Sequence, residues 1–369
     1  MKVLYSCLSK SWGGMEMVTL TGIKQLLKHN IKVELLCLEE SRLQIEANNL
    51  GIIIHPIKSG KVPNLFSSIK VNSIIKTGSF DLIHCHSSKD LWVIVPALSF
   101  IKSKTSLVFT KHVGSFINKK DLLHNKIYRK VDCAIAISSV IKKNLLDTTA
   151  LTENKIKTLF NGVDLKNFDP ENADRTKLRN ELGIKDDELL IGMTGRFSPG
   201  KGHEDFLLAI TELNKKYPEV KYVVIGEASR GEDEYEKKIK QIAEESEIKN
   251  ITFTGYRTDI PDVLAAIDIF VFPSHAEAFG VGLIEAMAMG KASVAANSDG
   301  VLDIVNDKID GLFFNSRDGL DLAAKIEILI KDTELRKHLG ANARKKAEQI
   351  FDLEIVTEQI INTYKQLIK

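Results

Sequence analysis

Two carboxylates, Glu277 and Glu285, lie on either side of Gly280, where a polar bend gives way to a stretch of helix-forming residues. The first N–H groups of a helix have no partner inside it, so they form a natural seat for phosphate. A carboxylate only accepts hydrogen bonds, and the hydroxyl groups of a sugar can donate them. This arrangement predicts a ligand that carries both a phosphate and a sugar.

A second candidate site is the glycine-rich segment 195–203, which follows an apolar run and contains Arg196 and Lys201. An arginine can grip phosphate with two N–H groups, and a lysine adds a compact positive charge. The alternative is a surface loop with incidental cations. Because the two cations bracket a loop at the end of a predicted strand, we favour a clamp for a diphosphate.

The N-terminal half contains weaker signals. Gly13 and Gly14 open a predicted helix, where glycine would let the backbone approach a phosphate, although a plain tight turn is the favoured interpretation of the pair alone. Side chains alternate between the two faces of a strand, so His84 and His86 lie on the same face of a predicted strand. His112 ends the next predicted strand. A zinc site is conceivable, but the sequence places no third ligand with the first two histidines. His112 could hydrogen-bond a substrate hydroxyl or serve the structure.

The elements that must position these residues follow a regular rhythm. Apolar, strand-like runs alternate with amphipathic stretches, which is typical of parallel, doubly wound sheets. The first series of predicted strands covers residues 3–8, 33–38, 52–57, 82–85, 107–110 and 134–137. The second covers residues 189–193, 222–225, 251–253, 269–272, 293–295 and 311–314. Between the two series, the polar stretch 165–174 is the predicted linker.

We therefore predict an α/β protein with two Rossmann-like domains that face each other across a cleft. The predicted domains are residues 1–165 and residues 166–351. A chain of 369 residues is long for a single domain. Ligands of such sheets bind at the carboxyl ends of the strands, so the candidate residues are expected to line the cleft.

Charge divides the chain into two halves. Residues 1–165 contain 23 Lys and Arg against 12 Asp and Glu, a net charge of +11, and residues 166–369 contain 28 against 37, a net charge of −9. A basic half can attract anionic lipid head groups, and segment 117–130 places cations beside apolar residues. A solvated basic helix is an equally favoured interpretation of that segment.

Cysteine usage and hydropathy suggest a cytoplasmic protein. The four cysteines lie in apolar segments without the spacing of a metal site, as expected for reduced thiols. The N-terminus lacks the features of a signal peptide, and no uncharged run approaches the roughly 20 residues of a membrane span. We expect no nucleic-acid partner.

The motifs together resemble those of a known family. The segment Glu277-Ala278-Phe279-Gly280, followed by Glu285, is similar to the E-x7-E signature of the retaining, GT-B-fold glycosyltransferases of family 4. Further matches occur in the order of that family, at Gly13-Gly14, His112, Asn161-Gly162-Val163-Asp164 and Gly195-Arg196 with Lys201-Gly202. The resemblance covers nearly the whole chain. It also implies that the last helix, 352–369, packs back on the first domain.

The resemblance implies catalytic roles for Glu277, His112, Arg196 and Lys201. It implies donor-binding roles for Gly13, Gly14, Arg196, Lys201, Tyr256, Arg257, Glu277, Phe279, Gly280, Val281 and Glu285. In this scheme Glu285 accepts the ribose hydroxyls, the two cations neutralise the diphosphate, and Tyr256 and Arg257 lie by the base. No metal or other cofactor is expected, because Arg196 and Lys201 supply the positive charge that a metal supplies elsewhere.

The activity implied by the resemblance is retaining, hexosyltransferase-type transfer from a nucleotide diphosphate sugar to a glycan or lipid-linked acceptor. Lipopolysaccharide, capsule or other cell-surface polysaccharide synthesis is the expected setting, with peripheral contact to an anionic membrane as a further expectation. Two alternatives remain open at this point. One is a nucleotide-sugar epimerase or hydrolase on the same scaffold, and the other is a non-catalytic nucleotide-sugar-binding subunit.

Overall fold

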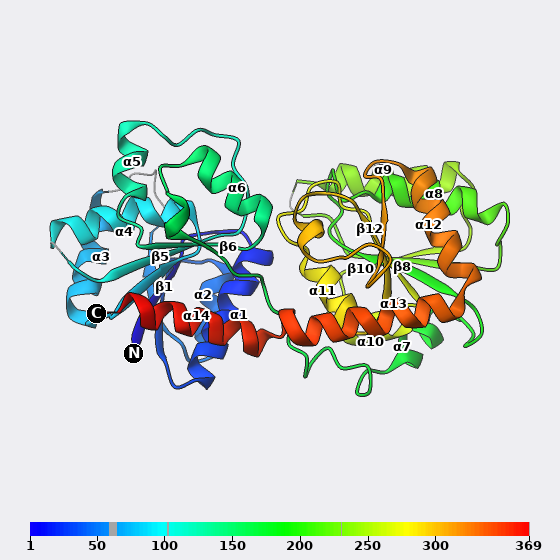
Figure 1. Cartoon of the computed structure of the whole chain (residues 1–369), viewed down its shortest axis with the longest axis horizontal. Helices are drawn as coiled ribbons and strands as arrows, with labels where there is room; N and C mark the ends of the chain where they lie inside the picture. The colour runs from blue at the N-terminus through cyan, green and yellow to red at the C-terminus, as the bar shows by residue number, and fades with distance from the viewer. Residues whose placement is uncertain (59–64, 102, 230, 369) are drawn as a thin grey trace. The chain divides into compact units, whose positions relative to one another are not determined.

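The computed structural model describes residues 1–58, 65–101, 103–229 and 231–368. The chain forms two compact units (Figure 1). Unit 1 comprises Met1–Asn161 and Glu354–Lys369, and unit 2 comprises Gly162–Leu353. Within the described residues, none of the helices combines the length and the apolar character that a membrane span requires.

Unit 1 is built on a parallel sheet with the strand order β3-β2-β1-β4-β5-β6-β7. Its strands are β1 (Lys2–Cys7), β2 (Lys32–Leu38), β3 (Ile53–Ile57), β4 (Leu82–Cys85), β5 (Ser106–Lys111), β6 (Cys133–Ala136) and β7 (Ile156–Thr158). Its helices are α1 (Gly14–Lys28), α2 (Arg42–Asn49), α3 (Leu65–Gly78), α4 (Ser88–Phe100), α5 (Leu122–Tyr128), α6 (Ser139–Thr148) and α14 (Leu353–Leu367), with a 3-10 turn at Glu153–Lys155.

Unit 2 is built on a second parallel sheet with the order β10-β9-β8-β11-β12-β13. Its strands are β8 (Leu190–Thr194), β9 (Lys221–Ile225), β10 (Ile251–Gly255), β11 (Ile269–Phe272), β12 (Ala292–Ala296) and β13 (Leu312–Phe314). Its helices are α7 (Arg175–Glu181), α8 (His203–Asn214), α9 (Asp233–Glu245), α10 (Ile260–Ala266), α11 (Val281–Ala288), α12 (Gly319–Lys331) and α13 (Thr333–Lys346), with a 3-10 helix at Asp299–Asp303 and a π-helix at Ala347–Phe351.

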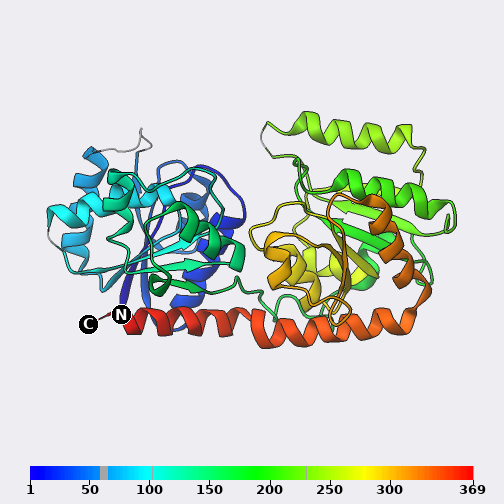
Figure 2. The ribbon, with the colours of Figure 1, turned by 45° about the horizontal axis from the view of Figure 1, so that its top comes forward.

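The predicted fold class is confirmed, since both units are parallel α/β sheets with helices on both faces (Figures 1 and 2). Covering both faces of a sheet buries every side chain of its central strands, which therefore appear in the sequence as unbroken apolar runs. All four residues of β11 are buried, as are all four of β6. Each of the twelve predicted strands overlaps an observed one, and only β7 was not predicted.

The predicted linker, residues 165–174, is wrong, because this stretch belongs to unit 2. Arg344 Nη1 donates to the carbonyl oxygen of Phe168 at 2.8 Å, and Asp174 caps α7 with its side chain. The chain instead leaves unit 1 after Asn161 and returns after Leu353. A polar composition alone therefore did not distinguish a linker from a segment that packs on its own domain.

Helix α14 packs on unit 1 through a fully buried tyrosine. The Tyr364 hydroxyl lies 3.0 Å from the Tyr5 hydroxyl of β1 and 2.5 Å from His84 Nδ1 of β4. The other ring nitrogen of His84 lies 2.7 Å from Thr110 Oγ1 of β5. The last long helix is thus hydrogen-bonded to the central strands of the sheet.

We expect Tyr364→Phe to lower the free energy of unfolding of unit 1 by about 1–2 kcal/mol, because two buried polar groups lose their partner. The chain's two tryptophans, Trp12 and Trp92, both lie in unit 1, so their fluorescence during urea unfolding reports on this unit. The matched control is Gln366→Ala on the same helix. This substitution removes an exposed hydrogen bond that Lys157 donates to Gln366, and it should lower the free energy of unfolding by less than about 0.5 kcal/mol. Equal losses in the two variants would contradict the role given to the tyrosine.

Candidate functional site

The predicted site residues of unit 2 lie after two strands that are neighbours in the sheet. Arg196 and Lys201 follow β8, Glu277 follows β11, and Glu285 lies in α11. Strands β8 and β11 pair in parallel at the point where the strand order reverses, which is where ligands of doubly wound sheets bind. The topology thus gathers these four residues at one edge of the second sheet.

A close backbone contact holds the two loops together. Gly202 has a φ of +77°, and a Cβ placed on it would lie 2.1 Å from the carbonyl oxygen of Pro273. His275 N–H also donates to the carbonyl oxygen of Gly200 at 2.8 Å. Only glycine satisfies both the backbone conformation and the contact at position 202. The loop after β8 is therefore fixed against the loop after β11.

This contact brings Lys201 beside Glu277. Lys201 Nζ lies 2.6 Å from Glu277 Oε2, and the Ser274 hydroxyl donates to the same oxygen at 3.3 Å. Both side chains of the ion pair are partly exposed, so the pair remains open to a ligand. Ser274, itself buried, is a residue that the sequence did not mark as functional. The pair offers a cation for a phosphate and a carboxylate for sugar hydroxyls at one place.

Arg196 is exposed, and its Nη1 donates to Ser229 Oγ at 2.9 Å. Among the residues that the structure describes, no carboxylate forms an ion pair with its guanidinium. The guanidinium therefore keeps most of its N–H groups available for an anion.

Helix α11 begins at Val281 after Gly280, whose φ of +122° is unfavourable for residues with a side chain. No side chain caps this helix end in the described structure. The Phe279 ring is buried and packs edge-on against Phe351, with 5.9 Å between ring centroids. Phe279 can therefore meet a ligand only through its backbone, as the phosphate-cradle prediction requires.

Glu285 lies in α11 and is partly buried. Its backbone carbonyl oxygen accepts from Met289 N–H, but its carboxylate has no hydrogen-bonding or ion-pair partner among the residues that the structure describes. Burial raises the pKa of Glu285 to about 7. A buried acceptor left unsatisfied costs free energy, which a ligand hydroxyl would recover.

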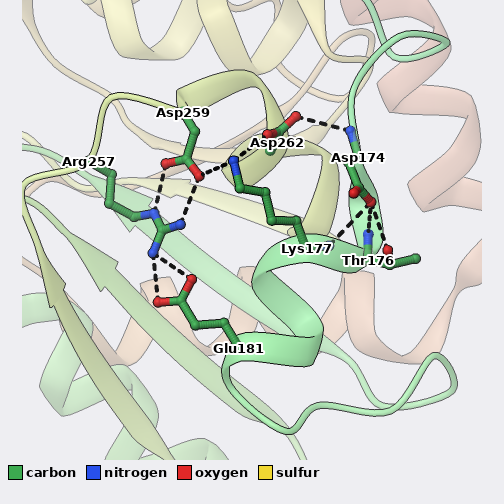
Figure 3. A network of polar contacts seen from close by, with 7 residues as sticks. All are labelled: Asp174, Thr176, Lys177, Glu181, Arg257, Asp259 and Asp262. Carbon is green, nitrogen blue, oxygen red and sulfur yellow. Dashed lines mark hydrogen bonds and ion pairs between the residues drawn. The ribbon is translucent and has the colours of Figure 1, made fainter.

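Arg257 belongs to a polar network within unit 2 (Figure 3). Its Nη1 donates to both carboxylate oxygens of Glu181, at 2.8 and 2.9 Å, and its Nε and Nη2 donate to Asp259 at 2.9 and 2.8 Å. Lys177 pairs with Asp259 as well, at 2.8 Å. These contacts occupy the guanidinium, so its predicted contact with the base stays a prediction. The neighbouring Tyr256 is 57% exposed and can stack on a flat ring.

In unit 1, Gly13 and Gly14 lie at the start of α1, as predicted from their position. Gly13 N–H donates to Glu16 Oε2 at 3.0 Å, so this amide already has a partner. Around Gly14 the described structure is open, with no atom within 4 Å of a Cβ built there. The space over Gly14 is compatible with the close approach of a ligand.

His112 is buried and lies against another histidine. Its Nε2 is 3.0 Å from His86 Nδ1, and the two rings are stacked with centroids 5.3 Å apart. Burial and the charge of Lys111 lower the pKa of His112 to about 4, so the imidazole is neutral at pH 7. Zinc binding by His84 and His86 is not supported, because both ring nitrogens of His84 have hydrogen-bonding partners.

Asp90 is a buried carboxylate that the sequence analysis missed. Its oxygens accept from the backbone N–H groups of Leu8, His86 and Ser87, at 2.9, 3.2 and 3.0 Å. It thereby ties the end of β1 to the start of α4, and burial raises its pKa to about 7. The sequence carried a signal for it, since Ser87 and Asp90 have the spacing of a capping box.

Comparisons with known proteins cover nearly the whole chain. The family model "Glycosyltransferase Family 4" matches residues 12–167, and the model "Glycosyl transferases group 1" matches residues 174–346. A Campylobacter jejuni relative is 32% identical over 226 residues, which are 59% of this chain and 56% of the relative. It is N,N'-diacetylbacillosaminyl-diphospho-undecaprenol alpha-1,3-N-acetylgalactosaminyltransferase. An Escherichia coli relative, UDP-Gal:alpha-D-GlcNAc-diphosphoundecaprenol alpha-1,3-galactosyltransferase, is 23% identical over 383 residues, or 100% of this chain and 97% of the relative.

Solved structures of other proteins have the same fold as this chain. A glycosyltransferase from Rickettsia africae superposes with a TM-score of 0.92 at 24% identity, over 100% of this chain and 98% of that one. The Anabaena protein HepE, solved in complex with UDP and glucose, superposes with a TM-score of 0.85 at 25% identity, over 99% of both chains.

Proposed function

The chain belongs to the group 1 glycosyltransferases of family 4, and from this membership we propose that it moves a sugar, with retention, from a nucleoside diphosphate sugar to a glycan or lipid-linked acceptor. The donor is bound by the loops after β8 and β11 of unit 2. The observation that carries this proposal is the Lys201–Glu277 pair, together with the start of α11 and the Glu285 carboxylate, which have no side-chain partner among the described residues. Together they offer a cation, backbone N–H groups and two carboxylates.

Each group has a defined task in this proposal. Lys201 and Arg196 bind the diphosphate and stabilise the negative charge that develops on it as the nucleoside diphosphate leaves. The amides of 279–281 hold the phosphate and the sugar. Glu285 accepts the ribose hydroxyls, and Tyr256 lies by the base. No metal takes part, because two positive side chains already face the leaving group.

Glu277 and His112 are the residues proposed to contact the transferred sugar. A neutral imidazole both donates and accepts hydrogen bonds, so His112 at pH 7 suits a hydroxyl better than it suits acid catalysis. Glu277→Ala should therefore remove turnover while donor binding is largely kept. A loss of binding equal to the loss of turnover would move Glu277 from the reaction to general donor binding.

The relatives support a setting in polysaccharide synthesis. The C. jejuni and E. coli relatives are named for acceptors linked to diphospho-undecaprenol, and a Staphylococcus aureus relative is named a capsular polysaccharide biosynthesis glycosyltransferase. HepE was solved with UDP-glucose as well as with UDP. We accordingly propose a nucleotide sugar as donor and a lipid-linked or glycan acceptor in cell-surface polysaccharide assembly.

A panel of nucleotide sugars, scored by thermal stabilisation, tests the proposal, because a ligand that binds only the folded state raises the melting temperature. The stabilising donor is then incubated alone and with acceptors. Consumption of the donor without acceptor would instead identify an epimerase or hydrolase. Tight binding without turnover on any acceptor would identify a binding subunit.

Glu285→Gln should stabilise the free protein at pH 8. The folded pKa of about 7 lies above the usual value for a glutamate, so stability falls as the pH rises from about 4.5 to 7 and stays reduced above that range. A glutamine does not ionise, and the variant should gain about 3 kcal/mol at pH 8 and nothing at pH 4. Thermal unfolding at both pH values measures this, with the exposed Glu244→Gln as control.

The same variant should lose affinity for the stabilising nucleotide sugar, because an amide has one acceptor oxygen and no charge, whereas a carboxylate offers a charged oxygen to each of two ribose hydroxyls. In the parent protein, affinity should rise as the pH passes through 7 and Glu285 ionises. Unchanged nucleotide affinity in Glu285→Gln at pH 8 would remove Glu285 from the donor site.

We further propose peripheral contact between the basic unit 1 and anionic membranes. Flotation with anionic liposomes should carry the protein at low salt and release it at high salt. Failure to float at either salt concentration would leave a soluble acceptor as the alternative.

A further inference from the structure

The segment from the end of β5 through the first turn of α5 exposes an unusual number of large apolar side chains. Their exposed fractions are 64% for Val113, 107% for Phe116, 68% for Ile117, 89% for Leu122 and 67% for Leu123. Scattered apolar residues on a surface are ordinary, but several in one short segment indicate a surface that meets an apolar partner. We call these five residues the apolar segment.

Two lysines lie at the base of the apolar segment. Lys111, the last residue of β5, is only 8% exposed, and its Nζ donates to Ser88 Oγ at 3.2 Å. Lys119 is partly buried, and its backbone N–H donates to the carbonyl oxygen of Thr148 at 2.7 Å, which fixes its position. Burial is the main cause that lowers the pKa of Lys111 to about 8, and the charge of Lys119 adds to it. Burial also lowers the pKa of Lys119.

Neither lysine forms an ion pair with a carboxylate among the described residues. Other lysines of unit 1 do so, as Lys2 pairs with Glu34 at 2.7 Å and Lys142 with Glu153 at 2.9 Å. Holding two cations together away from water without a counter-charge costs free energy. A bound anion would remove that cost, and a phosphate oxygen accepts strong hydrogen bonds from ammonium groups.

We propose that Lys111, Lys119 and Ser88 bind the phosphate of an acceptor in which phosphate joins the sugar to an apolar chain. The apolar segment holds the beginning of that chain. Lys111 directly precedes His112, so the acceptor phosphate lies near the residue that we assign to the transferred sugar. This inference rests on the proposed function, and it adds the residues that recognise the phosphate and the apolar chain of a lipid-linked acceptor.

Farnesyl diphosphate serves as a probe, because it joins a diphosphate to an apolar chain without any sugar. Calorimetric titration of the full chain should show tighter binding of farnesyl diphosphate than of farnesol or inorganic pyrophosphate. Lys111→Gln and Lys119→Gln should each weaken farnesyl diphosphate binding about tenfold, the usual loss for a charge-assisted hydrogen bond. Farnesol binding should not change in either variant.

Lys120→Gln is the matched control. Lys120 is the exposed neighbour of Lys119, so this substitution removes the same charge from the same segment. It should change farnesyl diphosphate affinity less than twofold. Equal weakening by Lys120→Gln would show diffuse attraction to a basic surface and would overturn the site. Pyrophosphate binding as tight as farnesyl diphosphate binding would overturn the part assigned to the apolar segment.

Two further measurements separate this inference from the donor site. Lys201→Ala should leave farnesyl diphosphate affinity unchanged, and an equal loss in that variant would place the probe in the donor site and refute the inference. Stabilisation by the nucleotide sugar should be the same in Lys111→Gln and in the parent, which also shows that the variant is folded. If the donor binds but both lysine variants bind farnesyl diphosphate normally, the inference fails and the proposed function stands. If no nucleotide sugar binds while both variants lose the probe, the proposed function fails instead.

Discussion

Replacing Lys201 with alanine is expected to lower kcat/KM for the nucleotide sugar by about 10²–10³-fold. The side chain is the cation nearest Glu277, and a preorganised group that faces developing charge contributes on this scale. Initial rates with the donor identified by thermal stabilisation measure the effect. Arg196→Ala should act in the same direction with a smaller loss, because Arg196 is exposed and more of its charge is screened by water.

The control for this prediction is Lys216→Ala, which removes an exposed ion pair with Glu327 in the same unit. It should leave kcat/KM within about twofold, as expected for a surface pair. A Lys201→Ala enzyme that stays within threefold of the parent would refute the clamp. The double variant Lys201→Ala with Glu277→Gln should lose less than the product of the single losses, because the two side chains act as one unit.

Arg179→Met is expected to lower the free energy of unfolding of unit 2 by about 3–5 kcal/mol. Arg179 is 1% exposed, and its guanidinium donates to the carbonyl oxygens of Ala266, Lys185 and Glu188 as well as to Asp268. These contacts tie α7 to the segments that directly precede β8 and β11. A methionine fills similar space but removes the guanidinium donor, although Lys185 still accepts from Glu188 N–H and Asp268 from Leu190 N–H.

Arg175→Met is a closely matched control. Arg175 lies one turn earlier in α7 and donates to the same carboxylate, Asp268, at 2.9 Å, yet its side chain is 40% exposed. Its loss should cost about 1 kcal/mol or less. Thermal unfolding followed by circular dichroism compares the two variants, since the tryptophans report on unit 1 only. Similar melting temperatures for both would contradict the weight given to burial.

Central strands such as β6 and β11 could be predicted from the sequence because burial on both faces leaves an unbroken apolar run. The three-residue β7 gave no such run, since only Ile156 among its residues is buried. Membership of the glycosyltransferase family, expected from the spacing of Glu277 and Glu285 with the loop of Arg196 and Lys201, is confirmed. The roles of these residues stay predictions.

Local sequence patterns did not predict contacts between residues that lie far apart in the chain. Lys201 and Glu277 were both predicted as site residues, but their 2.6 Å contact depends on β8 and β11 being neighbours in the sheet. The ion pair of Arg257 with Glu181 joins positions 76 residues apart, and no local signal marks it. The mutual approach of Lys111 and Lys119 likewise depends on how an irregular segment folds, which has no period to detect.

The contact between Gly202 and the carbonyl oxygen of Pro273 also bears on how this enzyme can change its substrate. Any side chain at position 202 would push the two loops apart and separate Lys201 from Glu277. A library that randomises the loop after β8 should therefore return active clones with varied residues at Ser198 and Pro199 but glycine alone at position 202. New donor specificity has to arise around this fixed point, in residues such as Tyr256 whose side chains are exposed.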